Sequence, residues 1–204
     1  IEVTVQNQTA KKAEIQLQGD IREWMNRAGT DINSAPVPDW TLGNEALSVA
    51  PAKVSVAAGT SQKVTLQVPV GKDVLKYWTP EHPNLYALLL SVKNQKQAVD
   101  TKYERFGWRE WTLQGTTQCL NGEPYALHGD SWHFMGIPQM TRRYAWAWFT
   151  AIKGMNANAV RPHAQVYPRF YLDMADEMGI CVLNETANWA SDGGPKLDSD
   201  LFWD

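Results

Sequence analysis

The chain has 204 residues, which is enough for one large domain or two ordinary ones, and its hydrophobic content of 44% supports a buried core. With 19 basic and 22 acidic residues, the formal net charge of -3 gives no electrostatic case for binding nucleic acid or an anionic membrane. No apolar run is long enough to cross a bilayer. We therefore expect a neutral partner and no association with nucleic acid or membranes.

Neither end of the sequence carries a signal that is typical of a natural terminus. Ile1 is not an initiator methionine and begins no signal-peptide pattern, and Asp204 follows no turn or capping signal. We expect both ends to be internal to a longer protein. The two cysteines, Cys119 and Cys181, lie in separate apolar segments, and we favour two buried free thiols over a disulfide. Cysteine usage leaves the compartment open, and we favour a periplasmic or extracellular location over a cytoplasmic one.

The first 109 residues show the period-two alternation of half-buried antiparallel strands rather than helical periodicity. The alternating or apolar segments cover residues 1–5, 13–18, 53–56, 63–68, 86–92 and 99–106. Several short strands separated by turn residues are typical of a β-sandwich. We therefore predict an all-β immunoglobulin-like sandwich over residues 1–109.

The period changes after Pro124. Strands are expected at 125–131, 158–160 and 180–183, and helices at 142–155 and 169–178. Strand and helix alternate in units of this length when a parallel sheet is built with right-handed crossovers. Three such strands cannot close a barrel, so residues 110–204 are predicted to be a truncated second domain.

Polar side chains stand where the second and third of these strands end. Arg161 and His163 follow the second strand, and Glu185 follows the third. A strand end fixes the backbone while the following loop leaves the side chain free to meet a ligand, which is how parallel β/α barrels build active sites. The sequence therefore predicts part of an enzyme active site.

Five motifs, in this order along the chain, resemble those of glycoside hydrolase family 2. They are Trp78–Tyr86, Tyr103–Arg109, Leu120–Pro124 with Leu127–Gly129, Asn158–His163, and Phe170–Ile180. The resemblance covers roughly residues 53 to 190. The family includes β-galactosidases, β-glucuronidases and β-mannosidases.

The resemblance implies a fragment of a larger enzyme. It implies a sugar-binding jelly-roll domain before Ile1, the immunoglobulin-like domain, and a catalytic TIM barrel of which residues 110–204 supply the first three β/α units. The parent is then a retaining, β-galactosidase-like exo-β-glycosidase that hydrolyses terminal β-linked sugars of oligo- or polysaccharides. The catalytic pair of Glu residues would lie beyond this chain, so the fragment itself is expected to be inactive. Its partners would be a carbohydrate substrate and the N- and C-terminal domains of the same protein.

The resemblance also implies residues that bind the substrate. His163 would donate to a sugar hydroxyl and Arg161 would orient neighbouring carboxylates. Asp130 and His133 resemble the family element after the first strand, although Asp130 could instead cap a turn. The substrate-binding residues that we predict are Asp130, His133, Arg161, His163, Glu185, Asn188 and Trp189.

The pair Asn184-Glu185 resembles the family's catalytic acid/base, which also follows an Asn. The count of strands argues against that role, because the acid/base follows the fourth barrel strand and Glu185 follows the third. We therefore expect Glu185 to support the site or to bind a hydroxyl, and the acid/base role stays open as the alternative.

Two alternatives to a glycosidase belong to other functional classes. A non-catalytic carbohydrate-binding or adhesion module is suggested by Trp24, Trp40 and Trp78, which we expect to be exposed, but it has no use for polar strand ends. A metal-dependent barrel hydrolase would need a His-x-His pair after the first strand, which the sequence lacks. No cofactor is expected, and a structural or catalytic-site cation in the parent stays open.

Overall fold

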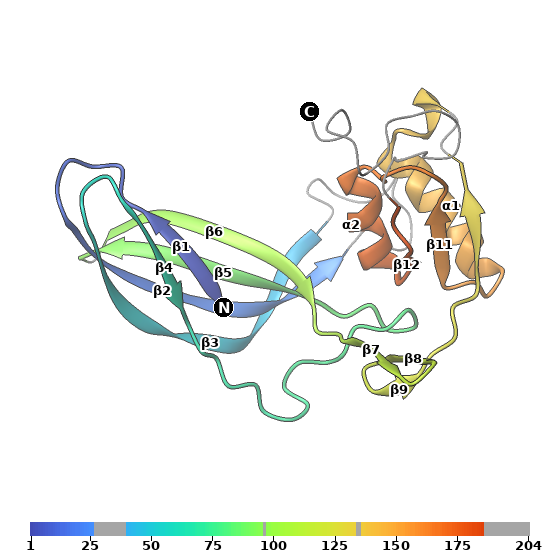
Figure 1. Cartoon of the computed structure of the whole chain (residues 1–204), viewed down its shortest axis with the longest axis horizontal. Coiled ribbons are helices and arrows are strands. Elements are labelled where there is room, and N and C mark those ends of the chain that lie inside the picture. Colours follow the sequence, from blue (N-terminus) through green and yellow to red (C-terminus); the bar gives the residue numbers. More distant parts are fainter. Residues whose placement is uncertain (27–39, 96, 134–135, 186–204) are drawn as a thin grey trace. The chain divides into compact units, whose positions relative to one another are not determined.

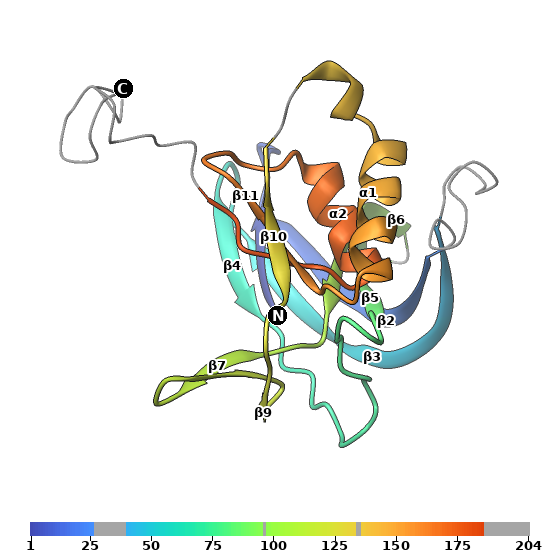
Figure 2. The same cartoon turned by 90° about the vertical axis from the view of Figure 1, so that its right-hand side faces the viewer.

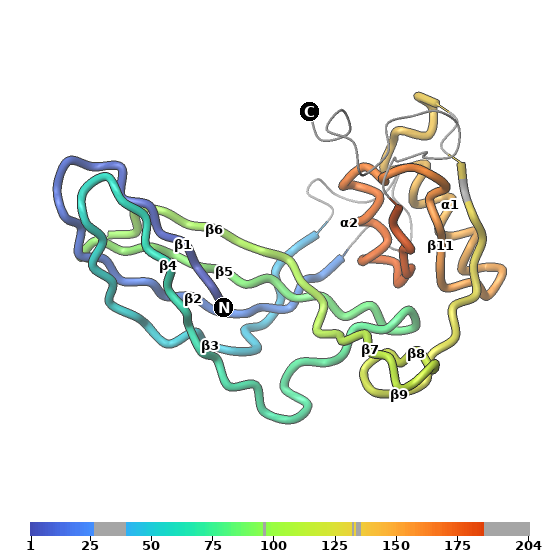
Figure 3. The backbone as a smooth tube through the Cα atoms, viewed as in Figure 1, coloured from blue at the N-terminus to red at the C-terminus, as the bar shows by residue number. Residues whose placement is uncertain are grey.

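The computed structural model describes residues 1–26, 40–95, 97–133 and 136–185, except for the side chain of Trp132 (Figure 1). The chain forms two compact units. The β unit consists of Ile1–Asn26, Trp40–Trp78 and Asn84–Trp108, and the β/α unit contains Thr79–Pro83 and the chain from Arg109 onward. The chain thus leaves the β unit for five residues between its fourth and fifth strands, a course that can be followed in Figure 3.

The β unit contains two antiparallel sheets. One pairs β1 (Glu2–Gln6) with β4 (Ser61–Thr65). The other has the order β3-β2-β5-β6, built from β3 (Trp40–Val56), β2 (Ala13–Asn26), β5 (Leu85–Asn94) and β6 (Gln97–Gly107). All six predicted strands are present, but β2 and β3 are far longer than the predicted 13–18 and 53–56. Their pairing contains several register shifts, and each shift breaks the period-two pattern on which the prediction relied.

The two sheets bury a shared apolar core. Leu17 and Val56 of the larger sheet are 1% exposed, and Val3, Val5 and Val64 of the β1–β4 pair pack against their cluster. Full burial of such a side chain contributes about 1.5–3 kcal/mol. The alternation of apolar and polar residues in the sequence therefore corresponds to an inward and an outward face of each strand.

The tryptophans that suggested an adhesion surface are mostly buried. Trp78 is 1% exposed and Trp24 is 9% exposed. Trp40 stacks on Trp24 with ring centroids 4.1 Å apart. The expectation that all three are exposed was wrong, because the side chains of Trp24 and Trp78 are buried in the core.

The β/α unit begins with a small antiparallel sheet that the sequence did not predict. It consists of β7 (Trp111–Gln114), β8 (Thr117–Leu120) and β9 (Glu123–Pro124). Asn121 and Gly122 both have positive φ, at 55° and 86°, in the turn between β8 and β9. Tyr125 continues this sheet, since its N–H donates to the Gln118 carbonyl (2.9 Å). The strand predicted at 125–131 therefore starts only at Gly129.

The rest of the unit has the predicted strand-helix alternation. The parallel sheet β10-β11-β12 is formed by β10 (Gly129–Trp132), β11 (Ala159–Pro162) and β12 (Cys181–Val182), with the short 3₁₀ helix η1 (Ile137–Gln139) and the helices α1 (Arg142–Gly154) and α2 (Arg169–Met178) between the strands. Thr141 caps α1, its Oγ1 accepting from Tyr144 N (3.1 Å). Gly179 ends α2 with φ 72°. A helix for the third predicted β/α unit would fall beyond residue 185, outside the described residues.

Both helices pack on one face of the parallel sheet (Figure 2). Phe149 of α1 and Tyr171 and Met174 of α2 are fully buried against Val160 of β11. Among the described helices, none is long and apolar enough to span a membrane. Both cysteines are buried, as predicted, and carry free thiols, and burial raises the pKa of the Cys181 thiol to about 11.

The segment Thr79–Pro83 is anchored within the β/α unit. The Pro80 carbonyl accepts from Nζ of Lys153 (2.7 Å), an ammonium group whose pKa is lowered by burial. Oε1 of Glu81 accepts from the Tyr125 hydroxyl (2.8 Å). These contacts tie the segment to α1 and to the approach to β10.

Candidate substrate-binding site

The parallel register decides which face of the sheet each polar residue occupies. Asp130 pairs with Val160, and Ser131 pairs with Arg161. Paired residues on neighbouring parallel strands share a face, and successive residues alternate. Because Val160 packs against the helices, Ser131 and Arg161 lie on the face turned away from them.

Arg161 links the carboxyl ends of the three strands. Its Nε donates to Oε1 of Glu185 (2.5 Å), which follows β12, and its Nη1 donates to Oγ of Ser131 on β10 (3.3 Å). The side chains of Arg161 and Glu185 are 44% and 30% exposed, so both can be reached by a ligand. The structure thus brings together two residues that are 24 positions apart.

The Glu185 carboxylate is held as an anion. Its Oε2 accepts from the Ala164 N–H (2.7 Å). That hydrogen bond is the main reason why the pKa of Glu185 lies below its usual value. Burial opposes it, while the contact with Arg161 and the charge of His163 lower the pKa further. A carboxylate with a lowered pKa accepts hydrogen bonds from hydroxyls well and is a poor proton donor.

The two histidines after the first and second strands are neighbours. The rings of His133 and His163 lie with centroids 4.4 Å apart at an interplanar angle of 43°. His163 also interacts by charge with Glu185, so the contact between the two rings links His133, through His163, to the Arg161–Glu185 pair. Imidazoles, a guanidinium and a carboxylate together can donate to and accept from several hydroxyls of one sugar ring.

The remaining predicted residues are not part of this cluster as described. Oδ1 of Asp130 accepts from the N–H of Ser131 (2.7 Å), and Asp130 has the strand position whose face is turned to the helices. This local contact is the kind that the turn-capping alternative expects, and substrate binding by Asp130 stays a prediction. Asn188 and Trp189 lie outside the described residues.

Two residues of the cluster, and one that stabilises the opposite end of the sheet, were missing from the predicted set. Ser131 contacts Arg161, and its register with Arg161 follows from the parallel pairing. Ala164 donates its backbone N–H to Glu185 from a left-handed conformation with φ 50°. An alanine in the sequence does not indicate such a conformation. Asn158 braces the opposite strand ends, because its Oδ1 accepts from His128 N (2.8 Å) and its Nδ2 donates to the Ala126 carbonyl (3.0 Å).

In the part of the chain that the structure describes, no three or more His, Cys, Asp or Glu side chains come together in a group that could hold a metal ion.

Comparison with known proteins places the chain in a family. The profile of glycosyl hydrolases family 2 matches residues 1–109. A putative β-glucuronidase of Formosa agariphila is 34% identical over 115 residues, which are 54% of this chain and 11% of that protein. A β-galactosidase of Priestia megaterium is 28% identical over 142 residues, which are 67% of this chain and 14% of that protein. The chain therefore spans a small part of the length of the curated relatives it matches.

Solved structures share the fold over most of the chain. The β-glucuronidase of Bacteroides uniformis superposes with a TM-score of 0.64 at 23% identity, over 89% of this chain and 20% of that one. A glycosyl hydrolase family 2 member from Bacteroides cellulosilyticus gives a TM-score of 0.69 at 17% identity, over 91% of this chain and 23% of that one. Since the family profile matches more than half of the residues, this chain belongs to glycosyl hydrolases family 2.

Proposed function

We propose that the chain is part of a retaining exo-β-glycosidase, β-galactosidase-like in its choice of a terminal β-linked sugar. In this proposal the β unit is an immunoglobulin-like domain, and β10, β11 and β12 are the first three strands of a catalytic TIM barrel. The names of the relatives support the class of activity, because they are a putative β-glucuronidase and a β-galactosidase.

The observation that carries the proposal is the polar cluster at the carboxyl ends of the parallel strands. Arg161, Glu185, His133 and His163 come from three different strand ends and meet there. Active sites of β/α barrels lie at this end of the strands, and residues there come from several strands. Four polar side chains that converge on one place are better suited to a sugar, which presents hydroxyls in several directions, than to an apolar ligand.

Glu185 is assigned a supporting role. A general acid for glycoside cleavage needs a raised pKa so that it is protonated at working pH. The pKa of Glu185 is instead lowered by the Ala164 N–H and by Arg161. We therefore propose that Glu185 orients Arg161 and accepts from a sugar hydroxyl, while two other carboxylates of the parent perform the chemistry.

In that chemistry one Glu attacks the anomeric carbon and another protonates the leaving oxygen. The second Glu then activates the water that hydrolyses the glycosyl-enzyme, with the two carboxyl groups about 5 Å apart. Arg161 and the histidines would hold the sugar in place through hydrogen bonds that are strongest in the transition state. The 204-residue fragment by itself is expected to give no turnover.

The deciding experiment uses the full-length parent and a panel of nitrophenyl β-glycosides. Hydrolysis of one or more of them, with the β-anomer as the first product seen by proton NMR, is the expected result. Release of the α-anomer first would exclude the retaining mechanism, and absence of turnover on every β-glycoside would exclude the proposed activity.

A binding module without catalysis is less well supported. Its basis was an exposed set of tryptophans, and Trp24 and Trp78 are buried. Binding of sugar by the parent without any hydrolysis would nevertheless favour it over the enzyme.

A further inference from the structure

One face of the four-stranded sheet carries a row of residues that crosses all four strands. Ser48, Asp20, Leu89 and Tyr103 belong to β3, β2, β5 and β6 and are successive register partners. Directly paired residues on antiparallel strands share a face. Ile21, the residue after Asp20, is buried in a core cluster. Because successive residues of a strand point to opposite faces, the row lies on the face turned away from that cluster. The row spans three strand spacings, about 14 Å.

These four residues line a groove of about 450 Å³. Ser91 and Thr101, a register pair on the same face, add two hydroxyls to its lining. Leu89 gives the groove an apolar floor, and the Tyr103 side chain is 53% exposed at one end of the row. The lining therefore combines an aromatic ring, hydroxyls, the carboxylate of Asp20 and one basic residue, Lys102.

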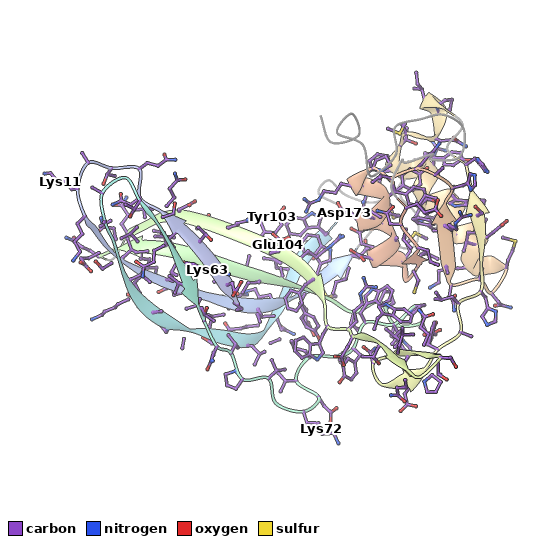
Figure 4. All side chains as sticks on the ribbon, viewed as in Figure 1. Lys11, Lys63, Lys72, Tyr103, Glu104 and Asp173 are labelled. Carbon is purple, nitrogen blue, oxygen red and sulfur yellow. The ribbon has the colours of Figure 1, made fainter. Side chains whose placement is uncertain are left out.

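The aromatic end of the groove is held in place by its neighbours. The Trp40 ring lies 5.8 Å from Tyr103, and Trp40 in turn stacks on the buried Trp24. The Arg105 guanidinium lies 5.4 Å from the centre of the Trp24 ring. Figure 4 labels Tyr103 on β6. A ring that is already packed loses little conformational freedom when a ligand stacks on it.

The charge of the groove selects among ligands. Oδ1 of Asp20 accepts from Nε of Arg22 (2.9 Å), and the Asp20 side chain is 26% exposed. A carboxylate in the middle of the row accepts from hydroxyls. Because Arg22 pairs with this carboxylate and Lys102 also lines the groove, acidic and basic groups are balanced there, which suits a ligand without charge. The C–H face of a sugar ring suits an exposed aromatic ring. We propose that this groove is a binding site for a neutral glycan chain, carried by the β unit rather than by the strand ends of the β/α unit.

This inference rests on the proposed function for the class of ligand, since the glycan would be the chain whose terminal sugar the parent removes. A site of this kind would keep a long substrate attached between cleavage events. It needs no catalytic residue, so it can be tested on the 204-residue chain.

The test is calorimetric titration of the chain with neutral β-linked tetrasaccharides of galactose, mannose and glucose, accompanied by amide NMR. We expect Tyr103→Ala to weaken binding at least about tenfold, because the stacking ring is lost. Tyr103→Phe keeps the ring and should retain most of the affinity, and Asp20→Asn should weaken binding several-fold. The matched control is Tyr77→Ala, because Tyr77 is 54% exposed in the same unit but outside the sheet.

Three results would overturn the inference. Equal binding by the Tyr103→Ala and Tyr77→Ala variants would show that the groove is not the site. Binding that is lost in His163→Ala but kept in Tyr103→Ala would assign the glycan to the strand ends, in agreement with the proposed function. No binding of any of the three tetrasaccharides would exclude the groove as a neutral glycan site, while hydrolysis by the parent would still decide the proposed function.

Discussion

Arg161 and Glu185 form an ion pair across the ends of β11 and β12, and the second oxygen of the same carboxylate accepts from the Ala164 N–H. One carboxylate thus fixes both a guanidinium and the turn that follows His163. Removal of Glu185 would therefore disturb the Arg161 guanidinium and the turn at Ala164. Under the proposed function, it would not remove a reacting group.

The first prediction concerns Glu185 in the full-length parent. Glu185→Ala should lower kcat/KM by about ten- to a hundredfold through lost positioning, and azide should not restore activity. Azide rescues retaining glycosidases that lack a catalytic carboxylate, because the small anion replaces the missing group. Formation of a glycosyl azide by Glu185→Ala would therefore contradict our assignment and make Glu185 catalytic.

The second prediction compares two histidines of the β/α unit. His163→Ala should lower kcat/KM of the parent by about ten- to a hundredfold, since a hydrogen bond of this kind contributes roughly 1.5–3 kcal/mol. His128→Ala is the matched control, because His128 is exposed and lies before β10, at the other end of the sheet. Equal losses in the two variants would show that the effect is not specific to the strand ends.

The third prediction concerns the end of α2. A Cβ on Gly179 would lie 2.2 Å from the Pro80 carbonyl oxygen, and Gly179 has φ 72°. Gly179→Ala should therefore destabilise the β/α unit by about 2–4 kcal/mol, from backbone strain and overpacking together. Gly154→Ala, at the end of α1, meets no atom within 4 Å and should be neutral or stabilising by about 0.5 kcal/mol. Urea unfolding followed by the helical circular-dichroism signal measures both, and a small effect at Gly179 would mean that the 79–83 segment can move aside.

The fourth prediction is a pH dependence of the same unit. Burial opposes the charge on Glu81, but hydrogen bonds from Tyr125 and from its own backbone outweigh it, so the pKa of Glu81 is lowered from 4.5. Burial and the Glu81 contact raise the pKa of Tyr125 from 10.0 to about 12. The ionised Glu81 side chain therefore adds to the free energy of unfolding. This stabilisation is complete above pH 4.5 and is lost as the pH falls through the lowered pKa of Glu81. The protonated Tyr125 hydroxyl likewise adds to the free energy of unfolding. This stabilisation is complete below pH 10.0 and is lost as the pH rises to about 12.

Two variants separate these contributions. Glu81→Gln should flatten the acid side of the stability profile, and Tyr125→Phe should flatten the alkaline side. Urea unfolding at a series of pH values, followed by the helical signal, provides the measurement. An unchanged acid side in Glu81→Gln would show that other carboxylates govern the loss of stability there.

The sequence predicted the elements whose signals are local. The bounds of α2 agree with the prediction at both ends, because an amphipathic stripe is followed by a glycine that stops the helix. The strand at 125–131 was placed too early, since the Asn158 side chain takes up backbone groups that a strand would have paired. The strand predicted at 53–56 is only the end of β3, and the rest of β3 was missed because its register shifts hide the alternation.

The same distinction holds for the site. The positions of Arg161, His163 and Glu185 after strand ends could be predicted, because strand ends can be located from apolar runs and polar residues follow them. Their role in substrate binding stays a prediction. The contact of the Ala164 N–H could not be predicted, because it depends on a left-handed backbone conformation that an alanine side chain does not indicate. The contact between Ser131 and Arg161 depends on register, which strand prediction alone does not provide.

The excursion of Thr79–Pro83 into the β/α unit limits where this chain can be recombined with a relative. The peptide bond between Trp108 and Arg109 is the boundary of the two units along the sequence. A chimaera joined there would take residues 1–108 from the other parent, and Pro80 and Glu81 would be replaced with them. Their partners Lys153 and Tyr125 would stay behind. Chimaeras made at this boundary should therefore succeed when the two parents share these contacts, and selection is expected to couple the four positions in natural lineages.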